Sequence, residues 1–242
     1  SEYYGPSQKL QRNNISDTIV FFGSARTISH KEAKKNLKNL SKNASKKDVR
    51  RCDIDLEMSR YYEETREMAK KFTKWSKGLK GSNHRYIVCS GGGPGIMEAS
   101  NRGASEAGGI NIGLTISLPF EVSGNEWISE DLNLKFHYFF MRKFWFLYLS
   151  KALIVLPGGY GTLDELMELL TLIQTGKIKK RLPIVLHGKD FWEKVVNWDY
   201  LVEIGTISPE DLDLFYVSDS VKDTFEHVTK FIEKNELRGP NF

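Results

Sequence analysis

Short apolar runs and longer amphipathic stretches alternate along the chain. The runs have the length of buried strands, and they cover residues 18–22, 85–89, 111–117, 153–156, 182–186 and 214–217. Between them, apolar residues recur at intervals of three and four positions, the spacing of one helix face, as in residues 55–77. Repeated strand–helix alternation is typical of a parallel sheet covered on both sides. The pattern therefore predicts an α/β fold: a doubly wound parallel sheet with helices on both faces.

This alternation continues without a break that would mark a linker. We expect residues 17–242 to form a single Rossmann-like domain, because a chain of 242 residues can bury a core of that size. Residues 1–16 are polar and predict a flexible N-terminal tail. Residues 29–53 are rich in lysine and arginine. We interpret them as a basic helical insertion whose lysines are spread around the helix.

One stretch joins the apolar run at 153–156 to the next helical pattern. Pro157 ends the run, and three glycines precede a helix that starts at about Thr162. The unpaired amides of a helix's first turn attract anions, and glycine lets a ligand approach the backbone closely. Two carboxylates, Asp164 and Glu165, lie in the same turn. The stretch therefore predicts half of a nucleotide-phosphate site that carries its own acid or base.

Another strand–glycine–helix junction lies earlier in the chain, at residues 90–95, and follows the run at 85–89; it is the first glycine junction, and residues 157–165 are the second. A lone glycine turn is a weak signal, but two that follow apolar strands in one domain favour a ligand site. Neither is a P-loop, and the dinucleotide fingerprint belongs after the first strand. The first strand ends instead in a turn with Ser24 and Arg26. There, a ligand contact and a solvated charge at Arg26 are about equally expected.

Residues 136–146 are unusually aromatic and predict an extended piece that turns into a helix. Most of these rings are expected in the core or at a subunit interface. Arg142 and Lys143 interrupt the apolar stretch, and a charge there is unfavourable unless it is paired. An anionic ligand would be a suitable partner, and an ordinary salt bridge is the alternative. The preceding residues, 121–134, predict a long loop over the site with two candidate contacts, Asn125 and Trp127.

Composition narrows the class of protein without identifying its chemistry. The net charge of +4 permits an anionic ligand but does not argue for nucleic acid. The two cysteines, Cys52 and Cys89, lie in different contexts, so we expect neither a disulfide nor a metal site, and a reduced cytoplasmic protein is the default. No apolar run approaches the roughly 20 residues of a membrane span, and the first residues lack the apolar core of a secretion signal.

Together, the two glycine junctions resemble the LONELY GUY family of cytokinin-activating enzymes, which has often been labelled lysine decarboxylase-like in error. Residues 157–165 match the family pattern PGGxGTxxE at every fixed position, and residues 90–98 resemble its first glycine motif. The resemblance covers about residues 18–190 and looks more like the longer bacterial members, although the basic insertion is a departure. It implies a phosphoribohydrolase. Such an enzyme cleaves the N-glycosidic bond of AMP or of N6-modified AMP, the cytokinin riboside 5′-monophosphates, to free base and ribose 5-phosphate.

The resemblance also implies roles for individual residues. Glu165 closes the motif and is the expected catalytic carboxylate, because glycosidic cleavage passes through an oxocarbenium-like state. Arg142 lies where the family carries its functional arginine and would hold and polarise the substrate. The expected substrate contacts are Ser24, Ser90, Gly91, Gly92, Gly93, Glu98, Leu118, Met141, Lys143, Gly158, Gly159, Tyr160, Gly161 and Thr162. No metal or other cofactor is implied. Family members are dimers or larger, so a homodimer or higher homo-oligomer is expected.

Two other functions are compatible with parts of this pattern. A non-catalytic nucleotide-binding regulator would keep the pocket without turnover, but the presence of both the carboxylate and the arginine favours the enzyme. A nucleic-acid binder would act through the basic insertion and would bind in a salt-sensitive manner. The absence of interleaved aromatic residues disfavours it.

Overall fold

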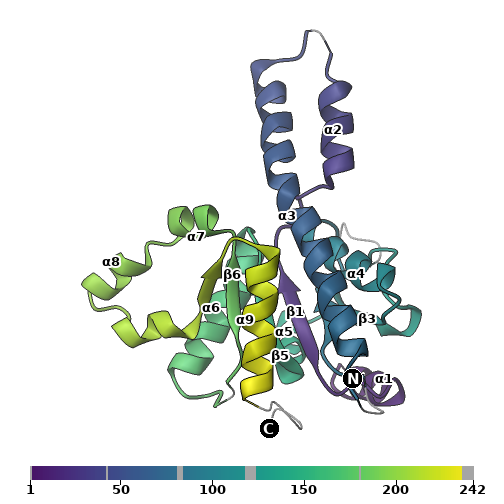
Figure 1. Ribbon diagram of the computed structural model, residues 1–242, viewed down its shortest axis with the longest axis vertical. Helices are drawn as coiled ribbons and strands as arrows, with labels where there is room; N and C mark the ends of the chain where they lie inside the picture. Colours follow the sequence, from purple (N-terminus) through teal and green to yellow (C-terminus); the bar gives the residue numbers. More distant parts are fainter. Residues whose placement is uncertain (1, 42, 81–83, 118–123, 180, 236–242) are drawn as a thin grey trace.

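The chain folds around a seven-stranded sheet in which the described strands all run parallel (Figure 1). The computed structural model describes residues 2–41, 43–80, 84–117, 124–179 and 181–235. The strands are β1 (Thr18–Phe22), β2 (Ile87–Ser90), β3 (Asn111–Ile116), β4 (Asn133–Phe136), β5 (Ser150–Val155), β6 (Ile184–His187) and β7 (Tyr216–Ser218). Their order across the sheet is β4-β3-β2-β1-β5-β6-β7. The predicted parallel α/β fold is confirmed.

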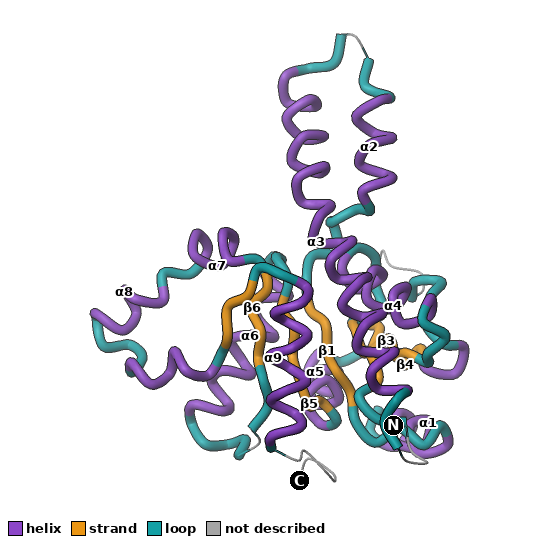
Figure 2. Tube along the Cα trace, viewed as in Figure 1, coloured by secondary structure: helices purple, strands orange, loops and turns teal. Residues whose placement is uncertain are grey.

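Helices cover both faces of this sheet (Figure 2). Side chains of β1 alternate between the two faces: Phe21 packs in the layer of α3, α4 and α9, and Phe22 in the layer of α5 and α6. The helices are α1 (Tyr4–Arg12), α2 (His30–Lys38), α3 (Lys46–Lys77), α4 (Ile96–Glu106), α5 (Phe139–Tyr148), α6 (Tyr160–Gln174), α7 (Lys189–Val195), α8 (Trp198–Glu203) and α9 (Val221–Lys234), with 3-10 turns η1 (Glu130–Leu132) and η2 (Pro209–Leu214). Across the described ranges, none of these helices combines the length and apolarity that a membrane crossing requires.

The strand order places a crevice between β1 and β5. From β1 the chain adds β2, β3 and β4 on one side, and it then returns to add β5, β6 and β7 on the other. The helices that follow β1 and β5 therefore lie on opposite faces: α3 packs through Phe72, and α6 packs through Leu166. Such a switch point leaves an opening at the carboxyl ends of the two strands, where ligands bind in open α/β sheets.

Strand β4 was not predicted, because residues 121–134 were expected to form a long loop. The stretch shows little periodicity in sequence, yet Asn133–Phe136 pairs in register with β3, which places Gly113 opposite Asn133. Strand β4 is defined by its pairing with β3 and by the burial of Leu134 and Phe136. Neither the pairing nor the burial can be read from the sequence. The predicted substrate contact Leu118 lies outside the described residues.

The N-terminal residues differ from the predicted flexible tail. Tyr4–Arg12 forms α1, and its Leu10 is buried in the core. The indole Nε1 of Trp145 donates a hydrogen bond of 3.0 Å to the carbonyl oxygen of Glu2. Residues 2–12 are mostly polar because only one side of this segment packs against the core. Contacts with α5 fix its position.

The predicted basic insertion forms an arm that projects from the body (Figure 1). One side of the arm is α2, and the other is the first part of α3, which continues unbroken into the body as a 32-residue helix. The two ends of the arm meet at its base, where a hydrogen bond of 2.9 Å joins Nδ1 of His30 to Oγ of Ser59. The amide of His30 also donates to Oε1 of Glu63.

Candidate active site

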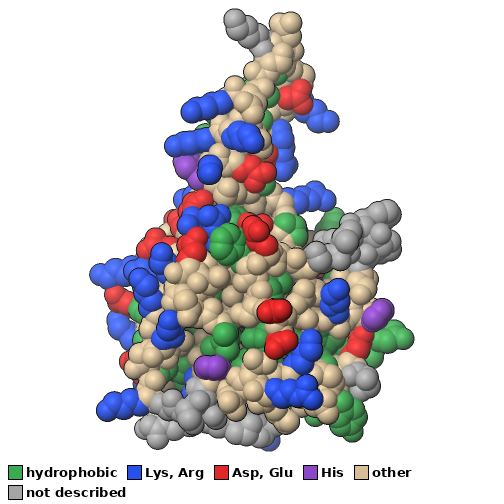
Figure 3. All heavy atoms as spheres, turned by 90° about the vertical axis from the view of Figure 1, so that its right-hand side faces the viewer, with side chains coloured by type: hydrophobic (Ala, Val, Ile, Leu, Met, Phe, Trp, Pro, Cys, Tyr) green, Lys and Arg blue, Asp and Glu red, His purple; other side chains and the backbone are tan. Residues whose placement is uncertain are grey.

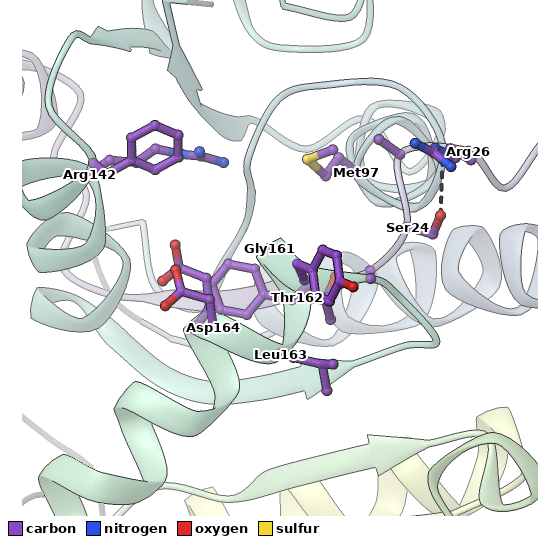
Figure 4. A pocket seen from close by; sticks show the side chains of 15 residues that line it. Ser24, Arg26, Met97, Arg142, Gly161, Thr162, Leu163 and Asp164 are labelled. Atoms are coloured by element: carbon purple, nitrogen blue, oxygen red, sulfur yellow. Dashed lines mark hydrogen bonds between the residues drawn. The ribbon is translucent and has the colours of Figure 1, made fainter. Parts of the chain in front are cut away.

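A cleft of about 600 Å³ opens at the carboxyl ends of β1 and β5, at the switch point of the sheet (Figure 4). Three segments line most of it: the turn after β1, the first turn of α6 and the start of α5. The lining residues are Phe22, Gly23, Ser24, Ala25, Arg26, Met97, Phe139, Arg142, Gly159, Tyr160, Gly161, Thr162, Leu163, Asp164 and Glu165. The cleft therefore brings together the second glycine junction and the first-strand turn.

The N-terminus of α6 forms one wall of the cleft. Helix α6 begins at Tyr160, directly after β5 and Pro157, so the unpaired amides of its first turn lie beside the cavity. Gly158 does not line the cleft, but it has a structural role. A Cβ built there would collide with the Thr162 side chain, so only glycine leaves room for Thr162 beside the turn. The arrangement is suited to bind an anion such as phosphate.

Glu165 lies in the second turn of α6 and lines the same cleft. Burial raises the pKa of its carboxyl to about 7, although the nearby cations Arg142 and Lys143 oppose part of this shift. The carboxyl therefore exchanges its proton near neutral pH. A group of this kind can accept a proton from water or remain as an anion beside a developing positive charge.

Arg142 reaches the cleft from α5, on the opposite side from Arg26 (Figure 4). Its Nε donates a hydrogen bond of 2.9 Å to the carbonyl oxygen of Leu114 in β3, and its guanidinium lies 5.2 Å from the centroid of the Phe146 ring. These contacts fix the orientation of the guanidinium, so it can meet an anionic or polar ligand without first being ordered.

Lys143 does not reach the cleft. Its Nζ forms ion pairs with Asp164 at 2.8 Å and with Glu168 at 2.6 Å, which join α5 to α6. Its placement differs from the predicted substrate contact and matches the alternative of an ordinary salt bridge. Asp164 lines the cleft, but it is occupied by this pair. Of the two acids in the motif, Glu165 is the more buried.

The first glycine junction supports the cleft but does not line it. Ser90 is fully buried, and its Oγ donates to Oδ1 of Asn101 at 2.7 Å and accepts from the amide of Gly92 at 3.0 Å. A Cβ at Gly91 would lie 2.5 Å from Nη2 of Arg142, so this glycine makes room for the arginine. The predicted contacts Ser90, Gly91, Gly92 and Gly93 therefore act here as structural support.

The predicted loop contacts also support this junction. The side-chain amide of Asn125 donates to the carbonyl oxygens of Gly92 and Gly93, at 3.1 and 3.0 Å. The indole ring of Trp127 lies beneath the guanidinium of Arg102, 5.1 Å from its centroid. Asn125 and Trp127 therefore contact other residues of the chain and stabilise the structure around the cleft.

Glu98 and Met141 also lie away from the cleft. The carboxylate of Glu98 accepts a hydrogen bond of 2.6 Å from the hydroxyl of Tyr62 in α3, and Met141 packs against the core. Met97, the neighbour of Glu98, is the residue of α4 that lines the cleft. Adjacent residues of a helix point in different directions, so only one of Met97 and Glu98 can face the cleft. The glycine motif alone did not show which one does.

The cleft also contains residues that sequence reasoning left open or did not select. Arg26, for which a ligand contact and a solvated charge were equally expected, lines it, and so do Phe139 and the turn residues beside Ser24. The amide of Arg26 donates to Oγ of Ser24 at 3.0 Å, which shapes the turn that presents the arginine. Its position after the first strand was the available signal, because the carboxyl ends of neighbouring parallel strands meet at one edge.

Comparisons with known proteins identify a family and several relatives. A family model described as possible lysine decarboxylase matches residues 97–228. The cytokinin riboside 5′-monophosphate phosphoribohydrolase LOG1 of Arabidopsis thaliana is 28% identical over 153 residues, which cover 62% of this chain and 70% of that protein. LOG7 of the same organism, with the same description, is 31% identical over 127 residues, 51% of this chain and 56% of that protein.

Two solved structures share the fold at low identity. The X-ray structure of TM1055, a structural genomics target, has a TM-score of 0.51 at 19% identity and covers 90% of this chain and 99% of its own. A molybdenum cofactor binding protein from Rippkaea orientalis has a TM-score of 0.52 at 15% identity, with coverage of 89% and 98%. The family model spans more than half of the chain, including the second glycine junction and Glu165. This chain therefore belongs to the family described as possible lysine decarboxylases, that of the LONELY GUY proteins.

Proposed function

We propose that this chain is a phosphoribohydrolase that cleaves the N-glycosidic bond of AMP or of an N6-modified AMP and releases free base and ribose 5-phosphate. The observation that carries the proposal is the position of Glu165: a half-buried carboxyl with a pKa of about 7, in one cleft with Arg142 and with the N-terminus of α6. The names of the relatives support the same reaction class.

The first turn of α6 would hold the 5′-phosphate. Its amides and the Thr162 hydroxyl supply hydrogen-bond donors, and the helix dipole favours negative charge at this end. Arg26, at the far side of the cleft, adds a positive charge. A nucleoside monophosphate bound in this way extends its ribose along α6 toward Glu165 and Arg142.

Glu165 would act as a carboxylate beside the anomeric carbon. Departure of the base leaves positive charge on the ribose ring, which an adjacent carboxylate stabilises. The same group takes a proton from the water that attacks the anomeric carbon. Arg142 would orient the substrate, since its guanidinium is held by Leu114 and Phe146 before any ligand binds. Water adds its hydroxyl to the sugar, and its proton leaves with the base.

The test is to incubate the purified protein with AMP and, separately, with isopentenyladenosine monophosphate, and to assay ribose 5-phosphate. We expect product from at least one substrate, and a loss of at least about 100-fold in rate for Glu165→Gln and for Arg142→Ala. The matched control is Glu193→Gln, which removes an exposed carboxylate of α7 away from the cleft. Absence of product from both substrates, or equal rates in all variants, would contradict the proposal.

The same experiment separates two alternatives. A non-catalytic nucleotide-binding regulator would bind AMP in a calorimeter without producing ribose 5-phosphate. Decarboxylation of lysine through a Schiff base needs a lysine in the site, and none of the described residues that line the cleft is a lysine. The label attached to the family model is therefore not supported by the residues of this cleft.

A further inference from the structure

The arm carries most of the positive charge of the chain. Residues 29–51 contain nine lysines and arginines against two acidic residues, a net charge of +7, whereas the whole chain has a net charge of +4. The rest of the chain is therefore acidic on balance. Figure 3 shows basic side chains along the projecting arm. This distribution favours an anionic partner that contacts the arm and stays away from the body.

Within the arm, the positive charge is concentrated on α2. This helix contains four lysines and one glutamate, a net charge of +3. The first part of α3, residues 46–57, contains four cations and four acidic residues and is neutral. One of these cations is also paired, because Nη2 of Arg51 lies 2.9 Å from Oδ1 of Asp55. The side of the arm that attracts an anion is therefore α2.

The lysines of α2 share one face of the helix. They occupy positions i, i+3, i+4 and i+7, and all four are exposed; they are Lys31, Lys34, Lys35 and Lys38. The sequence-based interpretation of lysines spread around the helix is wrong for α2, because another face of the helix packs against α3 through the buried Ala33 and the half-buried Leu37. Within the described ranges, no carboxylate lies at ion-pair distance from these four ammonium groups.

Local sequence signals order this lysine face before any partner binds. Oγ of Ser29 accepts a hydrogen bond from the amide of Glu32 at the start of α2. Ser45 and Asp48 form a capping box at the start of α3, the helix that supports α2. The lysines are thus presented on a preformed helix, which lowers the entropy cost of binding.

We propose that the lysine face of α2 binds the phosphate backbone of duplex DNA. An α-helix about 10–12 Å in diameter fits the major groove of B-form DNA, which is about 12 Å wide. Lysines on the face that enters the groove then reach phosphates along its edges. Contacts of this kind do not depend on the base sequence. The inference does not depend on the proposed catalytic function.

The composition of the lysine face favours DNA over a protein or a membrane. Specific protein interfaces have apolar side chains at their centre, and helices that lie on membranes bury an apolar face. The lysine face has four charged side chains and supplies no such apolar surface. Lysine binds phosphate as a point charge, without a fixed bonding geometry. The face therefore fits a partner that is bound through charge.

The arm is suited to a duplex rather than to a single strand. Proteins that bind single strands stack the bases on aromatic side chains, and neither α2 nor residues 46–57 contain phenylalanine, tyrosine or tryptophan. The absence of interleaved aromatic residues thus argues against one mode of nucleic-acid binding and leaves backbone contacts open. A-form RNA has a deep, narrow major groove that side chains cannot read. The groove of B-form DNA admits a helix.

Fluorescence anisotropy of the full chain with a labelled duplex DNA tests the proposal. The probe has mixed sequence and about 20 base pairs, two helical turns. In the wild type, the logarithm of the association constant should fall against the logarithm of the salt concentration with a slope of about −3 to −4, because each neutralised phosphate contributes about −0.9.

The arm variant is Lys34→Gln with Lys35→Gln and Lys38→Gln. It should bind at least about tenfold more weakly at low salt, and its slope should be smaller by about three, because three phosphate contacts are lost. Glutamine and lysine have similar helix propensities, so α2 should remain folded, which circular dichroism checks. The single variant Lys35→Gln should reduce the slope by about one.

Two further variants serve as controls. Lys74→Gln with Lys177→Gln and Lys234→Gln removes the same charge from exposed positions outside the arm and should bind the DNA as the wild type does. The charge-preserving variant, Lys34→Arg with Lys35→Arg and Lys38→Arg, should retain the wild-type slope, since arginine also neutralises phosphate.

Several outcomes would overturn the proposal. These are a wild type that does not bind the duplex at low salt, an arm variant with the wild-type affinity and slope, and a control outside the arm that loses as much as the arm variant. Tighter binding of a duplex RNA of the same length would assign the lysine face to RNA. Binding of vesicles of phosphatidylcholine and phosphatidylglycerol, without binding of DNA, would assign it to an anionic membrane surface.

Discussion

The two glycine junctions have the same pattern in sequence but different roles in the structure. Each follows a buried strand and precedes a helix. The turn after β5 lines the cleft, whereas the turn after β2 is packed against Asn101, Asn125 and Arg142. The cause is the topology: α3 and α4, which follow β1 and β2, lie on the same face, so no crevice opens between these strands. A glycine turn leaves room for another group close to the backbone. At the switch point of the sheet, that group can be a ligand, whereas elsewhere it is a side chain of the protein.

The largest expected effect tests the ligand-facing junction. Glu165→Gln keeps the size of the side chain and removes the carboxylate, so the rate of ribose 5-phosphate release should fall by about 10²–10⁴-fold. In the wild type, kcat/KM should rise with pH up to about pH 7, because the ionised carboxyl is the active form. A profile that falls as pH rises through 7 would instead assign Glu165 the role of an acid.

The second effect concerns how Glu165 changes the free energy of unfolding of the protein with pH. Folding raises the pKa of Glu165 from its ordinary value of 4.5 to about 7, so the folded state holds this proton more tightly than the unfolded state does. The protonated carboxyl of Glu165 therefore contributes to the free energy of unfolding. This contribution is fully present below about pH 4.5 and is lost as pH rises through 7. Above pH 7, Glu165→Gln should therefore unfold with up to about 3 kcal/mol more free energy than the wild type. Urea denaturation at pH 5 and pH 8 measures this; an equal difference at both pH values would contradict it.

A matched glycine pair tests the comparison directly. Gly158→Ala would push against Thr162 in the cleft wall, so the KM for the nucleoside monophosphate should rise by about tenfold. Gly92→Ala instead meets Thr115 and imposes a side chain on a backbone with φ of 72°, which should lower the free energy of unfolding by about 1–3 kcal/mol. Urea unfolding and steady-state kinetics on both variants separate the effects. The same response from both would show that the two junctions have one role.

The smallest effect concerns the buried serine of the supporting junction. Ser90→Ala removes the hydrogen bonds to Asn101 and from Gly92, so the free energy of unfolding should fall by about 1–2 kcal/mol. The KM for the nucleotide should stay close to the wild-type value, because Ser90 does not line the cleft. A large change in KM without loss of stability would return Ser90 to the binding site.

Much of the fold was predictable because buried strands and amphipathic helices leave local patterns. The strand–glycine–helix turn at 157–165 also identified one wall of the cleft, since its chemistry is local to a few residues. The resemblance to the family motif, rather than local chemistry, separated Glu165 from Asp164, and the ion pair from Lys143 to Asp164 is consistent with that division.

What sequence did not show depends on partners that are distant along the chain. Strand β4 is defined by pairing with β3, and α1 by contacts between Glu2 and Trp145. Glu98 turns away from the cleft because Tyr62 of α3, 36 residues earlier, binds its carboxylate. Helical spacing places residues on a face of a helix, but only the packing of that helix on the sheet shows which face meets a ligand.

The closed base of the arm has an evolutionary consequence. Because His30 and Ser59 touch, the chain leaves the body and re-enters it at nearly the same place. A segment with adjoining ends can be gained or lost in one genetic event without moving any strand of the sheet. The Rossmann-like domain and the arm can thus have separate histories. Relatives that lack the arm would keep the cleft.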